Sequence, residues 1–222
     1  MNAPTPVIAT PYSPESLETR ARARLSMEPP AHAFDPGRIP DRGDHQLAPM
    51  LAPSDGSLHR PAAVLIPVVA HPENASILLT RRASHLRDHS GQIAFPGGKI
   101  DEADPSPMAA AIREAGEEIG LAPDLIQPLG YLDAYLTSTG FRVVPVLSLV
   151  TPDYALELNP NEVDIVFETP LSFLMDPGNH QRHTREWKGS QRQYYAMPYG
   201  EHYIWGVTAG ILRNLYERLY AE

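Results

Sequence analysis

The spacing of apolar residues changes along the chain, and each change predicts a different kind of element. Two short apolar runs, "AAVLIPVVA" at 62–70 and "SILLTRR" at 76–82, flank the polar segment "HPEN" and predict a buried β-hairpin. Similar runs at 129–136, 141–150 and 163–167 predict further strands. The segment "GQIAFPGG" predicts another strand, which ends in a turn at its two glycines.

Other segments carry helical spacing. The clearest predicted helix spans 107–121, where Ser106 and Pro107 provide a typical start. A second helix is predicted at about 206–220, and a short one begins after Ser13. Strands interleaved with two or three helices predict a mixed α/β domain.

Proline content divides the chain into two parts. Residues 1–60 hold ten of the 24 prolines and few apolar runs, so we expect a Pro-rich N-terminal extension with one short helix. The domain itself is predicted to span 61–222. The role of the extension stays open.

Amino-acid composition limits which binding partners and which cellular compartment we expect. The chain has 42% hydrophobic and 20% charged residues, which is typical of a soluble globular protein. Its net charge of −9 argues against nucleic acid and anionic membranes as partners. It contains no cysteine, no signal-peptide pattern and no apolar run long enough to span a bilayer, so we expect a cytoplasmic protein. Whether it forms a homodimer stays open.

Three carboxylates share one face of the helix predicted at 107–121. Glu114, Glu117 and Glu118 stand at i, i+3 and i+4, a spacing at which like charges repel. Such a pattern is either a solvated acidic face or a site for a hard divalent cation, which prefers oxygen ligands. The double glycine at Gly97 and Gly98 favours a cation site, because its backbone can approach an ion closely.

Gly116 stands inside the same predicted helix. A glycine there costs about 1 kcal/mol relative to alanine. We expect either a close backbone approach at this residue or simple packing of the helix on a sheet.

Together these residues resemble the Nudix box, G-x5-E-x7-R-E-U-x-E-E-x-G-U, in which U is a bulky apolar residue. Gly98 begins the box, Asp104 stands at the position of its first glutamate, and "REAGEEIGL" at 113–121 completes it after eight residues rather than seven. Ala115 is small for an apolar U position, but the R-E-x-x-E-E-x-G core is intact. The resemblance implies the Nudix fold, in which helices sandwich a mixed β-sheet in an α/β/α arrangement.

The segment before the box resembles the signature of the Nudix subfamily that hydrolyses coenzyme A. That signature, L-L-T-x-R-[SA]-x3-R-x3-G-x3-F-P-G-G-x2-D-x2-D, is met from Leu78 to Asp104. The subfamily tolerates the longer box with an aspartate, so both departures agree with this resemblance. It implies coenzyme A as the small-molecule partner and 3′,5′-ADP and 4′-phosphopantetheine as products.

The charge of this segment agrees with an anionic substrate. Residues 78–99 carry a net charge of +3 inside an acidic chain. The pyrophosphate and 3′-phosphate of coenzyme A would need such cations, and guanidinium groups bind phosphate well. We therefore predict substrate contacts from Arg81, Arg82 and Arg87; the alternative for each is an ion pair on the surface.

The resemblance also implies a metal-assisted mechanism. Mg²⁺ or Mn²⁺ would be held by Glu114, Glu117 and Glu118, with a backbone carbonyl of Gly97 or Gly98. Arg113 would fix the loop and helix by pairing with Asp104 or Glu117. Glu162, in "NPNEVDIVFETPL", is a candidate general base, and a box glutamate is the alternative.

Other readings remain open on the sequence alone. The chain could hydrolyse another nucleoside diphosphate, such as ADP-ribose or NADH. It could also be a regulatory Nudix module that senses a nucleotide without cleaving it, although such modules usually lose box carboxylates. The preferred form of coenzyme A and the choice between Mg²⁺ and Mn²⁺ are not determined.

Overall fold

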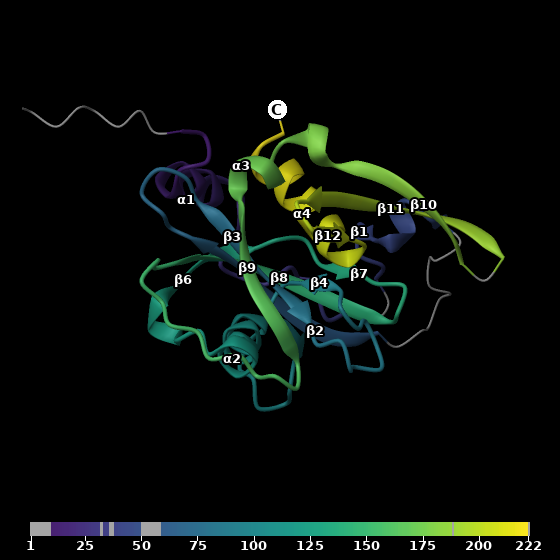
Figure 1. Cartoon of the computed structure of the whole chain (residues 1–222), viewed down its shortest axis with the longest axis horizontal. Coiled ribbons are helices and arrows are strands. Elements are labelled where there is room, and N and C mark those ends of the chain that lie inside the picture. The colour runs from purple at the N-terminus through teal and green to yellow at the C-terminus, as the bar shows by residue number, and fades with distance from the viewer. Residues whose placement is uncertain (1–9, 32, 36–37, 50–58, 188, 222) are drawn as a thin grey trace, which may run out of the picture.

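A computed structural model describes residues 10–31, 33–35, 38–49, 59–187 and 189–221 of the 222-residue chain. Within these segments the fold has three layers: helices, a mixed β-sheet and a second set of helices (Figure 1). The nine strands of this sheet are β1 (Arg42–Gly43), β2 (Arg60–Val69), β3 (Ser76–Arg82), β4 (Ile93–Ala94), β5 (Gly97–Lys99), β6 (Ile126–Tyr131), β7 (Tyr135–Leu136), β8 (Phe141–Val150) and β9 (Val163–Pro170).

Strands β2 and β8 form the spine of the sheet. They pair in parallel along their whole length, from Arg60↔Phe141 to Val69↔Val150. The second edge of β2 is shared: its last residues pair with β3, and its first residues pair with β5. The second edge of β8 is likewise shared by β6 and β7. Each of these two long strands is therefore paired along one edge with the other and along its second edge with two shorter strands.

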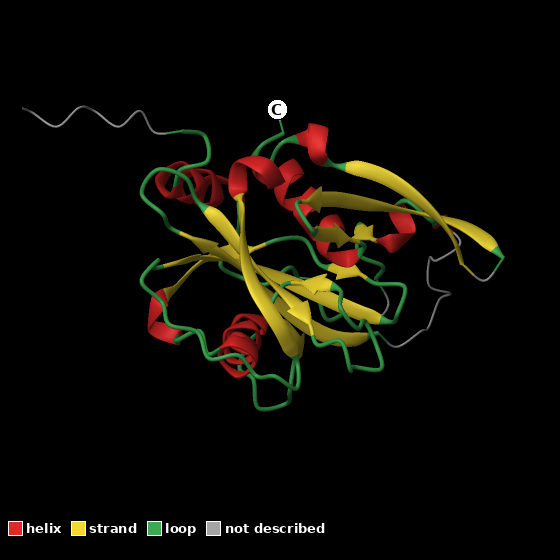
Figure 2. Ribbon diagram, in the orientation of Figure 1, coloured by secondary structure: helices red, strands yellow, loops and turns green. Residues whose placement is uncertain are grey.

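Helices cover both faces of the sheet. Helix α2 (Pro107–Ile119) lies on one face, and α1 (Pro14–Arg24) and α4 (Val207–Leu219) lie on the other (Figure 2). Side chains alternate along β2 so that Ala63 and Leu65 face α2, whereas Ala62 and Ile66 face the other layer. A single strand thus contributes apolar side chains to the cores on both faces of the sheet.

The remaining elements follow β9. The short helix α3 (Leu171–Leu174) precedes a second, three-stranded sheet, which consists of β10 (Gln181–Trp187), β11 (Ser190–Tyr199) and β12 (His202–Trp205). This sheet packs on α4. Among the helices of the described segments, none combines the length and the apolar content that crossing a bilayer requires.

The predicted helix starts are confirmed. Ser13 Oγ accepts a hydrogen bond from Ser16 N, and Ser106 Oγ accepts one from Ala109 N; in both helices a proline occupies the first turn. Such N-caps each contribute about 1 kcal/mol. Helix α1 packs on β6 and α4, with Leu17 fully buried, so the predicted N-terminal extension contributes to the core of the domain. The boundary predicted at residue 60 stays a prediction.

Two strand predictions need correction. The run at 129–136 forms two strands, β6 and β7, because β8 pairs with them at different points along its length. The double glycine does not end its strand in a turn. Gly97 and Gly98 lie in β5 and pair with Val64 and Ala63 of β2, an interaction between distant segments that local turn chemistry does not reveal.

Candidate active site

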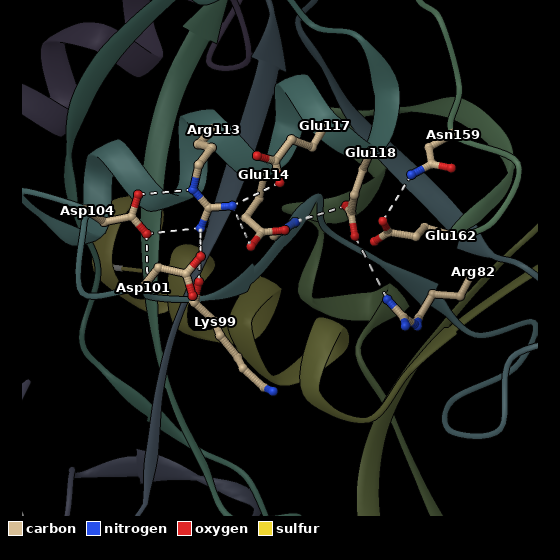
Figure 3. A network of polar contacts seen from close by, with 11 residues as sticks. Arg82, Lys99, Asp101, Asp104, Arg113, Glu114, Glu117, Glu118, Asn159 and Glu162 are labelled. Atoms are coloured by element: carbon tan, nitrogen blue, oxygen red, sulfur yellow. Dashed lines mark hydrogen bonds and ion pairs between the residues drawn. The ribbon is translucent and has the colours of Figure 1, made fainter.

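Arg113 organises one end of a carboxylate cluster on α2 (Figure 3). Its Nε and Nη2 donate to the two carboxylate oxygens of Asp104 at 3.0 and 2.9 Å, and Nη1 donates to Glu117 at 2.9 Å. Nη1 also lies 3.1 Å from Glu114 Oε1, and Nη2 donates to the carbonyl of Lys99. The predicted pairing of Arg113 with box carboxylates is confirmed. Its guanidinium ties the loop before α2, the helix and β5 together.

The electrostatic effect of this pairing is clear at Asp104. Hydrogen bonds from Arg113 lower the pKa of Asp104, and the same pairing raises the pKa of Arg113. This end of the cluster is therefore a fixed ion-pair network. It is structural in character, because every donor direction of the guanidinium is in use.

Glu118 occupies the other end of the cluster and is buried, with 3% of its surface exposed. Its Oε2 accepts a hydrogen bond from Gly97 N at 3.1 Å, and its Oε1 lies 3.9 Å from Arg82 Nη1. Burial raises the pKa of Glu118 to about 7, and the nearby charges of Glu162 and Glu114 act in the same direction. The reading of these glutamates as a solvated face is therefore wrong for Glu118. Tertiary packing against β5 covers it.

Gly98 makes room for Glu114. A Cβ atom at Gly98 would lie 2.5 Å from the Glu114 carboxylate, so this side chain can rest against the backbone of β5 only because residue 98 is a glycine. At Gly97, where φ is 154°, a Cβ would lie 2.4 Å from the Ala63 carbonyl oxygen. Gly116 is different, since its nearest neighbour would be 3.8 Å away. The close approach considered for Gly116 is absent within the described residues.

Glu162 lies beside Glu118, as Figure 3 shows. Asn159 Nδ2 donates to Glu162 Oε1 at 3.0 Å, and the backbone N–H of Asn159 donates to the Glu118 carbonyl at 2.9 Å. Burial is the main cause that raises the pKa of Glu114, and Glu162 adds to it. The structure thus brings the loop before β9 to the carboxylates of α2. Asn159, which the sequence analysis did not single out, joins the two.

The three arginines predicted to bind substrate have different surroundings. Arg82 lines a cleft beside Gly97 and Gly98, and its Nε is buried with no hydrogen-bond partner among the described residues. Arg81 is half-buried on β3, and Arg87 is exposed in the following loop. Neither lines this cleft, and neither makes an ion pair within the described segments. The structure therefore brings only Arg82 to the carboxylates.

The cleft has a volume of about 310 Å³ and a mixed lining. Its polar lining includes Arg82, Lys99 and the two glycines. Its apolar wall comes from segments far apart in the sequence: Phe95, Phe141, Val143, Val207 and Ile211. Sequence reasoning missed this wall, because strand periodicity marks these residues only as apolar. An aromatic residue, Phe141, at the start of a predicted strand is a weak signal in the sequence.

The carboxylate oxygens of the cluster are candidate ligands for a divalent cation. As the side chains stand, no three His, Asp or Glu residues within the described segments form a ready cation site. Arg113 holds Glu114 and Glu117, and Gly97 N–H holds Glu118. The chemistry nevertheless fits, because Glu118, Glu114 and Glu162 are oxygen donors whose mutual repulsion a hard cation would relieve.

Comparison with known proteins decides the family. The NUDIX domain family matches residues 59–192 of the chain. The protein belongs to the Nudix family. It is also similar to the protein called "Uncharacterized Nudix hydrolase NudL" of Escherichia coli strain K12, with 41% identity over 157 residues, which cover 71% of this chain and 81% of that protein. The NudL of Shigella boydii serotype 4 matches with the same identity and coverage.

Solved structures of Nudix proteins are also similar to this one. An Ap4A hydrolase from Caenorhabditis elegans in a binary complex has 19% identity and a TM-score of 0.43, covering 50% of this chain and 80% of that one. A MutT/nudix family protein from Enterococcus faecalis has 16% identity and a TM-score of 0.47, covering 75% and 64%. Nudix hydrolases act on small nucleotide-derived substrates and generally use divalent cations such as Mg²⁺ or Mn²⁺.

Proposed function

We propose that this Nudix protein hydrolyses the pyrophosphate bond of coenzyme A, releasing 3′,5′-ADP and 4′-phosphopantetheine. The observation that carries the proposal is the placement of Arg82. This arginine of the coenzyme A signature lies 3.9 Å from Glu118, and its buried Nε is unpaired among the described residues. A buried guanidinium donor without a partner is costly, and a substrate phosphate supplies the missing acceptor.

The mixed lining of the cleft supports the same substrate class. Coenzyme A combines phosphates with a long, flexible pantetheine arm. Arg82 and Lys99 provide cations in the cleft, and Phe95, Phe141 and Ile211 provide an apolar surface in it. The arm lies along this surface while the pyrophosphate reaches the carboxylates. Acylated and oxidised forms of coenzyme A would place the same groups in the cleft.

Each residue of the cluster then has a role. Glu114, Glu117, Glu118 and the Gly97 carbonyl would hold Mg²⁺ or Mn²⁺, which when bound neutralises charge on phosphoryl oxygens and makes water more acidic. Arg113 keeps Glu114 and Glu117 in position through the contacts described above.

The proton and the phosphates are handled by separate groups. Glu162 is oriented by Asn159 through Oε1, so its Oε2 takes the proton from the attacking water. Arg82 binds a phosphate of the substrate beside Gly98. In this proposal Arg81 and Arg87, which lie outside the cleft lining, contact the 3′-phosphate once substrate is bound, since neither guanidinium group makes an ion pair with a described residue.

The test is a product analysis. The purified protein is incubated with coenzyme A, NADH or ADP-ribose, each with Mg²⁺ or Mn²⁺, and products are separated chromatographically. We expect 3′,5′-ADP chiefly from coenzyme A, loss of activity in Glu118→Gln, and no loss in Glu102→Gln, which removes an exposed carboxylate of the loop before α2. Faster cleavage of NADH or ADP-ribose would overturn the substrate. No turnover of any of the three would favour a nucleotide-sensing module.

A further inference from the structure

A second cavity, of about 210 Å³, lies against another face of α4. Val207, Thr208 and Ile211 of this helix line the cleft of the proposed active site. The second cavity is lined instead by the N-cap residue of this helix and by residues on another of its faces: Gly206, Gly210, Arg213, Asn214 and Glu217. Its other walls come from β1, β7 and the hairpin of β10 and β11. The body of α4 thus separates the two spaces.

Positive charge exceeds negative charge in this cavity. Arg42, Arg182 and Arg213 line it, from β1, β10 and α4. Glu217 faces both Arg42 and Arg213, and it is the carboxylate that these two arginines share. Arg182 makes no ion pair with any described residue. Two guanidinium groups therefore share one carboxylate, and a third, from another element, lines the same cavity.

The other carboxylates nearby do not change this balance. Asp44 also lines the cavity, but Arg192 Nη2 lies 2.6 Å from its Oδ2, and Tyr135 Oη and Ser138 N also donate to it. Asp133 lies 3.9 Å from Arg42 Nε but is shared with Arg218 at 3.8 Å. Each of these acids is matched by its own arginine, so the excess of positive charge in the cavity stays. Such an excess is notable in a chain with a net charge of −9.

Aromatic and ionic contacts orient the guanidinium groups. The guanidinium carbons of Arg182 and Arg213 each lie 5.7 Å from the centroid of the Tyr195 ring. Stacking on an aromatic face orients a guanidinium and leaves its edge available for hydrogen bonds. Arg213 is fixed further by Glu217 at 2.7 Å. Arg42 and Arg213 are therefore oriented by Glu217 before any ligand enters.

A buried polar group in the wall has an unmet hydrogen bond. Asn214 is 1% exposed, and its Nδ2 donates to the Asp133 carbonyl at 3.4 Å. Its Oδ1 has no hydrogen-bond partner within the described residues. A buried acceptor of this kind calls for a donor, which a hydroxyl group of a ligand or a water molecule that accompanies it would supply.

We propose that this cavity binds a small phosphorylated molecule, with its phosphoryl group held by Arg42, Arg182 and Arg213. The charge favours phosphate over a single carboxylate, since a phosphate monoester carries −1.5 to −2 at neutral pH. Three guanidinium groups against one carboxylate match that charge. The volume, about two thirds that of the active-site cleft, suits a small ligand better than a dinucleotide. The proposal does not depend on the substrate of the carboxylate site.

Inorganic phosphate is the probe for this site. Binding is measured by equilibrium dialysis with radiolabelled phosphate on the full chain in the presence of EDTA, which prevents the carboxylate cleft from holding phosphate through a cation. We expect one saturable site per chain. Arg182→Ala should weaken binding at least tenfold, and it should leave the fold intact because Arg182 makes no ion pair with a described residue.

Two matched variants complete the experiment. Arg185→Ala removes an exposed arginine of the same strand, outside the cavity, and Arg82→Ala removes the arginine of the cleft; both should bind phosphate like the wild type. No saturable binding would overturn the proposal. Equal loss in Arg182→Ala and Arg185→Ala would overturn it in favour of non-specific attraction. Loss in Arg82→Ala alone would place the phosphate in the cleft instead.

Discussion

Arg113 and Arg82 stand at the two ends of one carboxylate cluster, and they are used in opposite ways. The guanidinium of Arg113 donates to Asp104, Glu117 and the Lys99 carbonyl, and it also contacts Glu114. Arg82 lies no closer than 3.9 Å to Glu118 and keeps a buried, unpaired Nε among the described residues. The hydrogen-bond donors of Arg113 are all paired within the protein, which we call the saturated end of the cluster. Arg82 keeps donors that a ligand could pair with, and we call this the open end.

This difference distinguishes the end of the cluster that stabilises the fold from the end that we propose for catalysis. The saturated end fixes the loop before α2, and its pairing lowers the pKa of Asp104. The open end holds a buried carboxylate whose pKa burial raises to about 7. Ion pairs that satisfy each other stabilise a fold, whereas a buried carboxylate and an unpaired guanidinium donor are retained at a cost in stability. We therefore expect the open end to carry the proposed catalytic function.

The largest effect should come from Glu118 at the open end. Glu118→Gln keeps the acceptor for Gly97 N–H but removes the charge, so hydrolysis should fall about 10³-fold, a loss typical of a group that stabilises developing charge or transfers a proton. The measurement is kcat under saturating Mg²⁺. Glu102→Gln is the matched control with an exposed carboxylate. An active Glu118→Gln protein would show that the open end is not the catalytic one.

The same carboxylate should make the metal-free protein less stable as pH rises. The native pKa of Glu118 is about 7 against an ordinary value of 4.5, so the native state binds its proton more tightly than the unfolded state. Stability should therefore fall between pH 4.5 and 7, by about 3 kcal/mol, and level off above pH 7.

Chemical denaturation in EDTA at pH 5 and pH 8 measures this effect. Glu118→Gln should lack it, so the stability of the variant relative to the wild type should be higher at pH 8 than at pH 5. Other titrating groups are common to both proteins and cancel in that difference. A difference that does not change with pH would mean that Glu118 ionises at its ordinary pKa and that its burial imposes no penalty.

Replacing the two arginines in parallel tests the comparison directly. Arg82→Ala should lower kcat/KM by about 10- to 100-fold, because a charged hydrogen bond to phosphate contributes about 1.5–3 kcal/mol, and its Tm should change little. Arg113→Ala should lower Tm by roughly 5 °C, because Asp104 and Glu117 lose their shared partner. Thermal denaturation and steady-state kinetics on both variants separate the roles. If Arg82→Ala proved the less stable of the two, the assignment would be reversed.

The sequence predicted the saturated end better than the open one. Helical spacing alone places Arg113 within reach of Glu117, four residues further on, and Asp104 lies in the loop just before the helix. These are local relationships, so periodicity and capping residues reveal them.

The open end depends on contacts between distant segments. Glu118 is buried because β5 pairs with β2 and brings Gly97 against it. The apolar wall of the cleft joins Phe95, Phe141 and Val207, which are far apart in the chain. Periodicity assigns such residues to a core, but it cannot tell which of them border an open space. The proposed phosphate cavity escaped prediction for the same reason.

The smallest effects should come from replacing two glycines, Gly98 beside the carboxylate cluster and Gly116 within α2. At Gly98 a new Cβ would lie 2.5 Å from the Glu114 carboxylate, which is the movable end of a side chain. Gly98→Ala should therefore displace Glu114 and lower kcat about tenfold with little loss of stability. Gly116→Ala meets nothing closer than 3.8 Å, so it should raise the unfolding free energy by up to about 1 kcal/mol and leave kcat unchanged. Denaturant unfolding and steady-state kinetics on these two variants distinguish Gly98, which the site requires, from Gly116, whose replacement by alanine should stabilise the helix. Equal loss of activity in both would mean that α2 as a whole, rather than the contact of Gly98 with Glu114, tolerates no added side chain.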